Sequence, residues 1–164
     1  MMADEVFSWL EQNIVDGATI LEFGSGHGSI KLAERYNLFS VEHDNEWVGI
    51  SDSTYIFAEI KENSISTEHE QKGWYDPSPI QDVVKKNIID VFIIDGPPGT
   101  IGRHGLLSLL DILPKSAIFI VDDVHRDPEL DLFNKLAEWH GGKDIIYSSR
   151  YDSGKERKWA VLLP

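Results

Sequence analysis

Blocks of apolar residues alternate along the chain between two patterns, one typical of buried strands and one typical of amphipathic helices. Short runs rich in β-branched residues predict strands at residues 19–23, 38–41, 54–60, 88–94 and 117–121. Apolar side chains at three- and four-residue spacing predict helices at 4–13, 29–36 and 102–113, and helices that begin at Ser78 and Asp127. The connection formed by residues 42–53 is too short for more than a turn or two of helix.

The last part of the chain predicts a hairpin. Residues 144–149 and 158–163 form two predicted strands around a polar turn at Asp152, Ser153 and Gly154. Five strand–helix alternations followed by this hairpin predict a doubly wound α/β fold, with a mostly parallel, seven-stranded, Rossmann-like sheet covered on both faces. Because the sequence has neither repeats nor a low-complexity linker, we expect residues 1–164 to form a single domain.

Charge and composition limit the partners that this domain can take. Lys and Arg total 15 against 28 Asp and Glu, a formal net charge of −13, which disfavours nucleic acid because binding phosphates relies on basic groups. The chain has no cysteine, which excludes disulfides, iron–sulfur clusters and thiolate zinc sites. The acidic start, Met1 to Glu5, lacks the regions of a signal peptide, and no apolar run reaches the ~20 residues of a membrane span. We therefore expect a soluble cytoplasmic protein without a membrane partner.

Polar clusters follow four of the predicted parallel strands, at the end where each strand stops. They comprise residues 22–28, 42–44, 95–99 and 122–126. In doubly wound sheets, ligands bind at the carboxyl ends of the strands, near the point where strand order reverses. The clusters therefore predict one binding site along this edge of the sheet.

The first cluster is a glycine-rich turn between a strand and a helix, with the sequence Glu22-Phe23-Gly24-Ser25-Gly26-His27-Gly28. Glycines let the chain turn tightly and bring its backbone close to a ligand. Glu22 stands two positions before the first glycine, where a carboxylate can hold an ammonium group. Glu42 ends the next strand, eighteen residues after Gly24, where an acid can accept hydrogen bonds from ribose hydroxyls.

With this motif the chain resembles the class I S-adenosylmethionine (SAM)-dependent methyltransferases. Their motif E/D-x-G-x-G-x-G is matched by Glu22, Gly24, Gly26 and Gly28, and their acid after the second strand is matched by Glu42. The order of elements follows the family over nearly the whole chain. The resemblance implies that Glu22 and the glycine turn, Ser25 included, face the methionine part of SAM, and that Glu42 faces the ribose. The alternative cofactor, NAD, needs G-x-G-x-x-G, whereas here the third glycine comes two residues after the second instead of three.

Asp95, Asp122 and Asp123 follow the fourth and fifth predicted strands, which we expect to be neighbours. Converging carboxylates suit Mg²⁺ or another divalent cation, whereas strand-end aspartates also cap turns and helices through hydrogen bonds; both interpretations stay open. The three positions resemble those of catechol-type, metal-dependent O-methyltransferases, which implies a metal that binds and acidifies the acceptor hydroxyl. The lysine that serves as general base in that group, three residues after the first Asp, is replaced here by Pro98.

The missing lysine leaves the general base open. Asp95, His104 and His125 are the candidate catalytic residues, since both histidines follow the critical strand ends and titrate near neutral pH. Each histidine is alternatively a surface or helix-capping residue. Residues 95–103 also resemble sugar- and polysaccharide-directed O-methyltransferases, in which case Arg103 binds an acidic acceptor, or only caps its own helix.

Residues 61–77 form a long polar segment that we expect to bind the acceptor and to be mobile without ligand. Its Trp74 and Tyr75 either stack on a sugar or aromatic ring or pack the segment onto the sheet. Either this segment closes the site, or a second subunit of a homodimer does, or the acceptor is large and only partly enclosed.

The sequence thus predicts a SAM-dependent O-methyltransferase that acts on a hydroxyl of a small molecule or saccharide, with or without help from a divalent cation. Two other functions stay open on the same sheet. One is an aminopropyltransferase, whose carboxylates would bind a polyamine. The single short loop, however, gives little surface to line a polyamine-binding site. The other is a non-catalytic SAM-binding regulatory or scaffold subunit, which the missing lysine and the short segment 42–53 favour.

Overall fold

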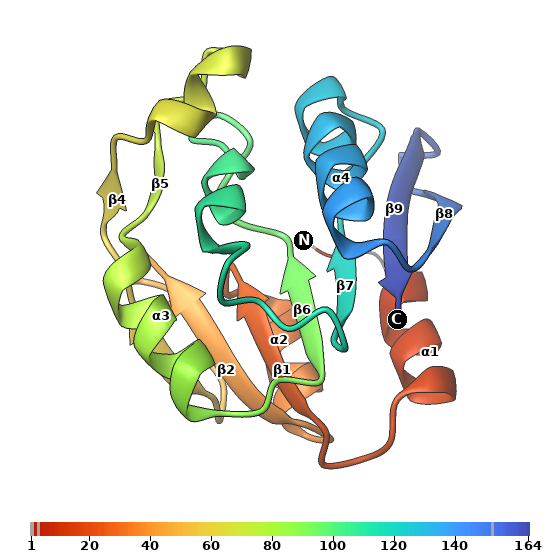
Figure 1. Cartoon of the computed structure of the whole chain (residues 1–164). Helices are drawn as coiled ribbons and strands as arrows, with labels where there is room; N and C mark the ends of the chain where they lie inside the picture. Colours follow the sequence, from red (N-terminus) through yellow and green to blue (C-terminus); the bar gives the residue numbers. More distant parts are fainter. Residues whose placement is uncertain (1, 3, 152) are drawn as a thin grey trace.

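A sheet of seven strands carries the fold in the computed structural model, which describes residues 2, 4–151 and 153–164 and only the backbone of residues 66–68 (Figure 1). The strands are Thr19–Phe23 (β1), Asn37–Glu42 (β2), Thr54–Phe57 (β3), Val91–Ile94 (β6), Ile118–Val121 (β7), Lys143–Arg150 (β8) and Glu156–Leu163 (β9). Their order across the sheet is β3-β2-β1-β6-β7-β9-β8. Neighbouring strands are parallel except at β9, which runs antiparallel to both β7 and β8. The predicted doubly wound sheet with a C-terminal hairpin is confirmed.

The register brings the ends of four strands level at one edge of the sheet. Phe23 of β1 pairs with Val41 of β2 on one side and with Ile94 of β6 on the other, and Ile94 pairs in turn with Val121 of β7. The segments that follow these strands therefore meet at the same edge. Strand order reverses between β1 and β6, which is the point where ligands bind in doubly wound sheets.

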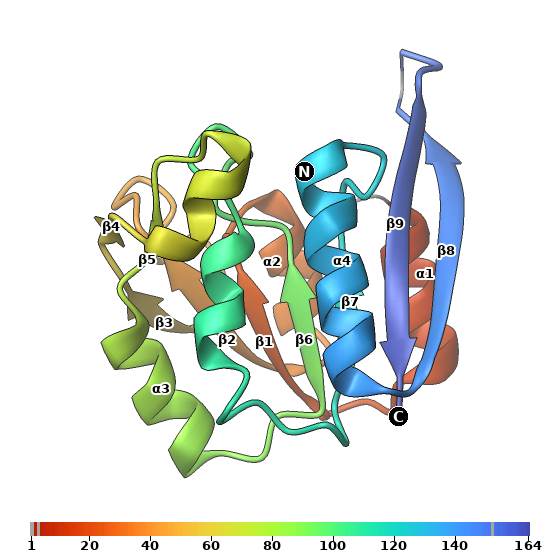
Figure 2. The same cartoon turned by 45° about the horizontal axis from the view of Figure 1, so that its top comes forward.

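Helices cover both faces of the sheet because the strand side chains are apolar on both (Figures 1 and 2). On one face, α1 (Asp4–Asn13) and α2 (His27–Ala33) pack Leu10 and Leu32 into the same apolar cluster as Ile93. On the other face, α3 (Pro77–Lys86), the 3-10 helix η2 (His104–Leu109) and α4 (Asp127–His140) pack into a second cluster that contains Phe92 and Phe119. Consecutive strand residues such as Phe92 and Ile93 thus point to opposite faces, as the pleat requires.

The third strand is shorter than the sequence predicts. β3 ends at Phe57, and Ile60–Lys61 (β4) instead pairs antiparallel with Trp74–Tyr75 (β5) in a separate two-stranded sheet. The chain leaves the main sheet after the amide of Ala58 donates to the carbonyl of Glu42 at 2.9 Å. The predicted polar segment 61–77 therefore contains regular structure: the end of β4, the 3-10 helix η1 (Ser64–His69) and β5.

Other element boundaries differ from the predicted ones by a few residues. The helix predicted at 29–36 begins two residues earlier and ends three residues earlier, and the segment predicted as a helix at 102–113 forms η2 followed by turns. The strand predicted at 88–94 begins only at Val91. α3 begins at Pro77 because Asp76 caps it, with Asp76 Oδ1 accepting from the Ser78 amide at 3.0 Å.

A few predicted features lie outside the described residues: Met1 and Ala3 of the acidic start, and Asp152 of the hairpin turn. Residues 43–53, all of them described, connect β2 to β3 through turns and bends without a helix. In the part of the chain that the structure describes, none of the helices has the length and apolar character needed to cross a bilayer.

Candidate functional site

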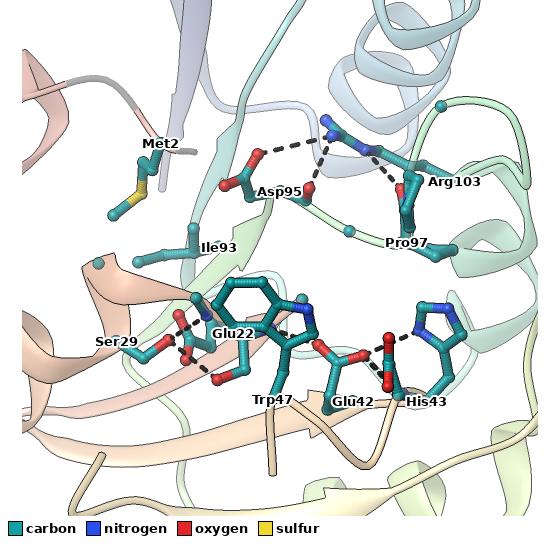
Figure 3. Close-up of a pocket in the computed structure, with 18 of the residues that line it drawn as sticks. Met2, Glu22, Ser29, Glu42, His43, Trp47, Ile93, Asp95, Pro97 and Arg103 are labelled. Carbon is teal, nitrogen blue, oxygen red and sulfur yellow. Dashed lines mark hydrogen bonds and ion pairs between the residues drawn. The ribbon is translucent and has the colours of Figure 1, made fainter. Parts of the chain in front are cut away.

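A cavity of about 510 Å³ opens at the switch point of the sheet, within the size range of small-molecule sites. Its walls come from the turn after β1, the end of β2 with the segment that follows it, and the loop after β6. Figure 3 shows Glu22 and Glu42 on one side of this cavity and Asp95 with Arg103 on the other. Asp123 also lines it, so all four predicted polar clusters contribute to one site.

The glycine turn after β1 fits closely against the loop after β6. Gly24 has a φ of +91°, and a Cβ on it would lie 2.8 Å from the Cα of Gly96, so backbone conformation and contact both require glycine. A Cβ on Gly26 would meet no heavy atom within 4 Å, which shows that this part of the turn borders open space. A Cβ on Gly28 would lie 3.0 Å from the ring of Phe7. Gly24 therefore allows the left-handed backbone and the contact with Gly96, Gly26 leaves space for a ligand, and Gly28 leaves space for the Phe7 ring.

Glu22 lines the cavity although it is only 4% exposed. Its Oε1 accepts a hydrogen bond from Ser40 Oγ at 2.6 Å. Burial is the main reason that the pKa of Glu22 is raised to about 7. Hydrogen bonds from Ser29 and Ser40 oppose this rise, and the carboxylates of Asp95 and Glu42 add to it. A cationic group in the cavity would stabilise the ionised form of Glu22.

Glu42 is buried at the end of β2 and organises the backbone around it. Its Oε1 accepts from the amides of His43 (2.7 Å) and Asp44 (2.9 Å). Its Oε2 accepts from the amide of Ser25 (2.8 Å), which ties the end of β2 to the glycine turn. Since a carboxylate oxygen can accept two hydrogen bonds, Oε2 keeps one position for a donor in the cavity.

The aromatic side chains of Tyr75 and Trp47 complete the cavity wall. Tyr75 is 1% exposed, and its hydroxyl has no hydrogen-bond partner among the described residues. Tyr75 and Trp74 both belong to the apolar cluster under α3 and η2, so of the two predicted roles they take the packing one. Trp47, 37% exposed, lines the cavity with its indole edge-on to the His27 ring at 5.6 Å.

Asp122 is fully buried at the end of β7 and forms an ion pair with Arg157 of β9. Arg157 Nε donates to Asp122 Oδ1 at 3.2 Å, and its Nη2 donates to Oδ2. Burial, together with the charges of Asp95 and Asp123, raises the pKa of Asp122 to about 7 against the lowering effect of Arg157. Two-point pairing of this kind suits a guanidinium because its planar fork matches a carboxylate.

Arg103, 3% exposed, joins the ends of β6 and β7. Its Nη2 donates to the carbonyl of Asp95 at 2.6 Å, and its Nη1 donates to the carbonyl of Asp122 at 3.0 Å. Its Nη2 also donates to Asp123 Oδ2 at 3.3 Å, where Arg126 Nη1 lies 3.1 Å away. Burial raises the pKa of Asp123, but the neighbouring arginines outweigh burial, and the pKa is lowered. Arg103, which also lines the cavity, is thus a buried cross-link, and its side chain makes no capping hydrogen bond at the start of η2.

This arrangement does not fit the predicted divalent-metal site. Oxygen atoms of Asp95, Asp122 and Asp123 lie within 4.8 Å of one another. However, both oxygens of Asp122 are bound by Arg157, and those of Asp123 are bound by two arginines and by the Tyr151 hydroxyl at 3.0 Å. A metal would have to displace guanidinium groups that already compensate the buried charge. Asp95 is different, because its side chain is 19% exposed and lines the cavity.

The sequence matches no protein-family model and no curated protein sequence. Its fold, in contrast, is similar to solved structures of methyltransferases. An O-methyltransferase from Bacillus cereus in complex with SAH aligns with a TM-score of 0.62 at 13% identity, over 100% of this chain and 83% of that one. The O-methyltransferase TomG from Streptomyces achromogenes, in complex with SAM, gives 0.61 at 15% identity, over 99% and 81%. An rRNA methylase from Streptococcus thermophilus gives 0.55 at 13% identity, over 100% and 99%.

The chain has the class I methyltransferase fold. This likeness confirms the predicted sheet and order of elements, including the antiparallel strand near the C-terminus. In this methyltransferase fold, the cavity lies at the carboxyl ends of β1, β2 and β6, where the sequence motif places its acids and glycines.

The two histidines predicted as alternative bases lie outside the cavity. His104, 1% exposed on η2, points toward α4, with its Nε2 2.8 Å from Asp131 Oδ2. His125 lies against the C-terminal hairpin, where its Nδ1 accepts from the Lys158 amide at 3.4 Å. Of the three predicted catalytic residues, Asp95 alone lines the cavity.

Sequence reasoning missed Arg157 and Tyr151. Arg157 stands on β9, and its side chain reaches Asp122 because β9 lies next to β7 in the sheet. Tyr151 follows β8, and its hydroxyl reaches Asp123. No local pattern marks either residue, since both come from a hairpin about thirty residues further along the chain. Strand order, which the sequence does not state, was the missing information.

Proposed function

We propose that the chain is a SAM-dependent O-methyltransferase that acts on a hydroxyl of a small molecule or saccharide. The observation that carries this proposal is the cavity at the switch point, where Glu22 and Glu42 lie opposite Asp95 (Figure 3) and Gly26 also lines the wall. These residues match the methyltransferase motif one by one, apart from Asp95, which follows β6. Fold neighbours that are O-methyltransferases, in complex with SAM or SAH, support the same assignment.

The residues of the cavity fit SAM. Glu22 offers a buried carboxylate to the ammonium group of the methionine part, and the open side of Gly26 lets a ligand approach the backbone. Glu42 Oε2 has an acceptor position for a ribose hydroxyl, and the Tyr75 hydroxyl lacks the hydrogen bond that a buried polar group requires. Trp47 offers an aromatic face to the adenine.

SAM, when bound, supplies a methyl group already activated on a sulfonium sulfur. The protein then has to hold the acceptor in line and take the proton of its hydroxyl. Asp95 is placed for the second task, because it lines the cavity and its contact with Arg103 Nη2 (3.5 Å) is made through Oδ1. Asp95 would accept the hydroxyl proton of the acceptor during transfer of the methyl group from SAM.

The charge pattern favours a neutral or weakly acidic acceptor over a nucleic acid. The formal net charge of −13 opposes RNA binding, although one fold neighbour is an rRNA methylase. Arg126, whose side chain is 43% exposed, lines the same cavity as Asp95 and would suit an acidic or hydroxyl-rich small molecule. The site does not fit a divalent metal, because the three arginines bound to Asp122 and Asp123 leave no fitting donor set.

Transfer of a labelled methyl group from SAM to a panel of catechols, sugars and polyamines tests the proposal. We expect the parent to methylate a hydroxyl acceptor at the same rate in Mg²⁺ and in EDTA. Asp95→Asn should lose about 100-fold or more in turnover, the range for a general base, and keep its affinity for SAM. Reaction only with polyamines would instead support an aminopropyltransferase. Tight SAM binding in the parent without turnover on any acceptor would support a regulatory subunit.

A further inference from the structure

A second cluster of polar side chains lies outside the cavity, where three helical elements meet. η1, η2 and α4 each contribute one residue to it: His69, His104 and Asp131. Asp131 Oδ2 lies 2.8 Å from His104 Nε2 and 3.1 Å from His69 Nε2. We propose that these three side chains form a binding site for one transition-metal dication of the Zn²⁺ type.

The donor set selects the class of metal. Two imidazole nitrogens and one carboxylate oxygen suit Zn²⁺, Co²⁺ or Ni²⁺, whereas Mg²⁺ and Ca²⁺ prefer oxygen ligands alone. With metal–ligand bonds of 2.0–2.1 Å, neighbouring ligand atoms of a tetrahedral site are about 3.3 Å apart. The distances of 2.8 and 3.1 Å around Asp131 Oδ2 therefore need to open by only a few tenths of an ångström. Three protein ligands leave the fourth position to water.

The surroundings of His104 favour a metal at its Nε2. Its Nδ1 lies 3.3 Å from Gln71 Oε1, which accepts a hydrogen bond from the ring in the tautomer that carries its proton on Nδ1. The neutral ring then carries a lone pair on Nε2, which faces an oxygen of Asp131 at 2.8 Å. In that tautomer, a cation between the two atoms would bind both lone pairs. An orienting hydrogen bond on the second ring nitrogen is the usual support of a metal-binding histidine.

Lys135 supplies part of the positive charge in the metal-free state. Its Nζ lies 2.9 Å from the same Asp131 oxygen. The Lys135 side chain is 38% exposed, so it can move into solvent when a dication takes its place. Lys135 is therefore a competitor of the metal, and its removal should tighten metal binding.

A metal here would link residues 61–77, the segment expected to bind the acceptor, to the rest of the domain. The amides of Lys72 and Gly73, just after η1, both donate to the carbonyl of Ile101 at 2.8 and 3.2 Å. Ile101 belongs to the loop that runs from Asp95 to η2. One ion bound by His69, His104 and Asp131 would thus join η1, η2 and α4, and η2 directly follows this loop. This site is independent of the arginine-bound aspartates and of the proposed SAM chemistry.

Titration of the full chain, free of any histidine tag and stripped of metal, with Co²⁺ and Zn²⁺ tests the site. We expect one Co²⁺ per chain with the visible absorption of a nitrogen-ligated ion, its displacement by Zn²⁺, and a higher melting temperature with Zn²⁺ but not with Mg²⁺. His69→Ala, at a half-exposed position, should abolish the absorption. Gln71→Ala should weaken binding about tenfold or more, and Lys135→Met should strengthen it.

Asp95→Asn and His125→Gln are the matched controls, and both should bind Co²⁺ like the parent. Loss of binding in Asp95→Asn with retention in His69→Ala would move the metal to the cavity and overturn the proposal. A parent that neither binds Co²⁺ nor gains stability with Zn²⁺ would also overturn it. The three side chains would then form a hydrogen-bonded clamp only. None of these outcomes depends on methyl transfer.

Discussion

The backbones of Gly24 and Gly96 are in contact just after the ends of β1 and β6. A Cβ on Gly24 would lie 2.8 Å from the Cα of Gly96, and a Cβ on Gly96 would lie 2.6 Å from the Cα of Gly24. The contact fixes the glycine turn relative to Asp95, which directly precedes Gly96. The two sides of the proposed active site thus pack directly against each other because neither glycine carries a side chain.

Gly24→Ala and Gly26→Ala should separate the structural from the ligand-binding glycine. Gly24→Ala has to adopt a φ of +91°, which costs about 1–3 kcal/mol by itself, and it also overlaps Gly96. Gly26→Ala has extended backbone and open space around it, so its stability should change by about 0.5 kcal/mol or less, while SAM binding weakens. Urea unfolding and SAM titration measure the two effects. Equal stability loss in both variants would contradict this division.

The sequence was sufficient for the parts of the site that follow a local rule. The glycine turn, Glu22 and Glu42 form a motif within two strand–helix units, and the structure places all of them around one cavity. Alternating apolar blocks likewise predicted the sheet, because buried parallel strands are apolar on both faces.

The sequence was insufficient where long-range packing decides. His104 was predicted at the cavity because it follows β6, but η2 directs its side chain to Asp131 on α4. The aspartates suggested a metal because the sequence did not reveal that Arg157 of the distant hairpin pairs with Asp122. The third strand was predicted too long, since β4 has the apolar pattern of a strand but pairs in a different sheet.

SAM binding should depend on pH through Glu22. Its pKa of about 7 lies above the usual 4.5, so near pH 6 the free protein must release a proton before the carboxylate can hold an ammonium group. Affinity for SAM should therefore rise about tenfold between roughly pH 6 and pH 7.5 and then level off. Calorimetry across this range measures the effect. Glu22→Gln should bind SAM more weakly with a flat profile, and a parallel slope in both proteins would exclude Glu22 as the cause.

The raised pKa of Glu22 also makes the free protein less stable as pH rises. Because the folded state holds the Glu22 proton more tightly than the unfolded state, the free energy of unfolding falls between about pH 4.5 and pH 7, by up to about 3 kcal/mol. Urea unfolding of the parent and of Glu22→Gln, compared at both ends of this range, isolates the contribution. SAM at saturating concentration should reduce the difference, since it stabilises the ionised form.

Arg157→Met should be strongly destabilising. It leaves Asp122, which is fully buried, without its guanidinium partner, and breaking a buried ion pair costs about 3–5 kcal/mol. Asp122→Asn in the Arg157→Met background should restore part of this loss, because the amide carries no charge to compensate. Denaturant midpoints of the three proteins measure the effect. A loss below about 1 kcal/mol in Arg157→Met would mean that the pair contributes no more than a surface ion pair.

Tyr75→Phe should stabilise the free protein and weaken its hold on SAM. The Tyr75 hydroxyl is buried without a partner among the described residues, and an unsatisfied buried polar group costs about 1–3 kcal/mol. Its removal should raise the melting temperature of the free protein. The gain should shrink or reverse with SAM present, when the hydroxyl finds a partner. A lower melting temperature of the free Tyr75→Phe protein, together with unchanged affinity for SAM, would show that the hydroxyl stabilises the fold instead.

Calorimetric titration of the parent chain with SAM, and separately with NAD, tests the central claim most directly. The glycine spacing, the cavity at the switch point and the acids Glu22 and Glu42 predict saturable binding of one SAM per chain at low-micromolar strength, with NAD binding far more weakly. Gly26→Ala, folded like the parent, should lose most of the SAM signal. No heat of binding with SAM, or tighter binding of NAD than of SAM, would contradict the account.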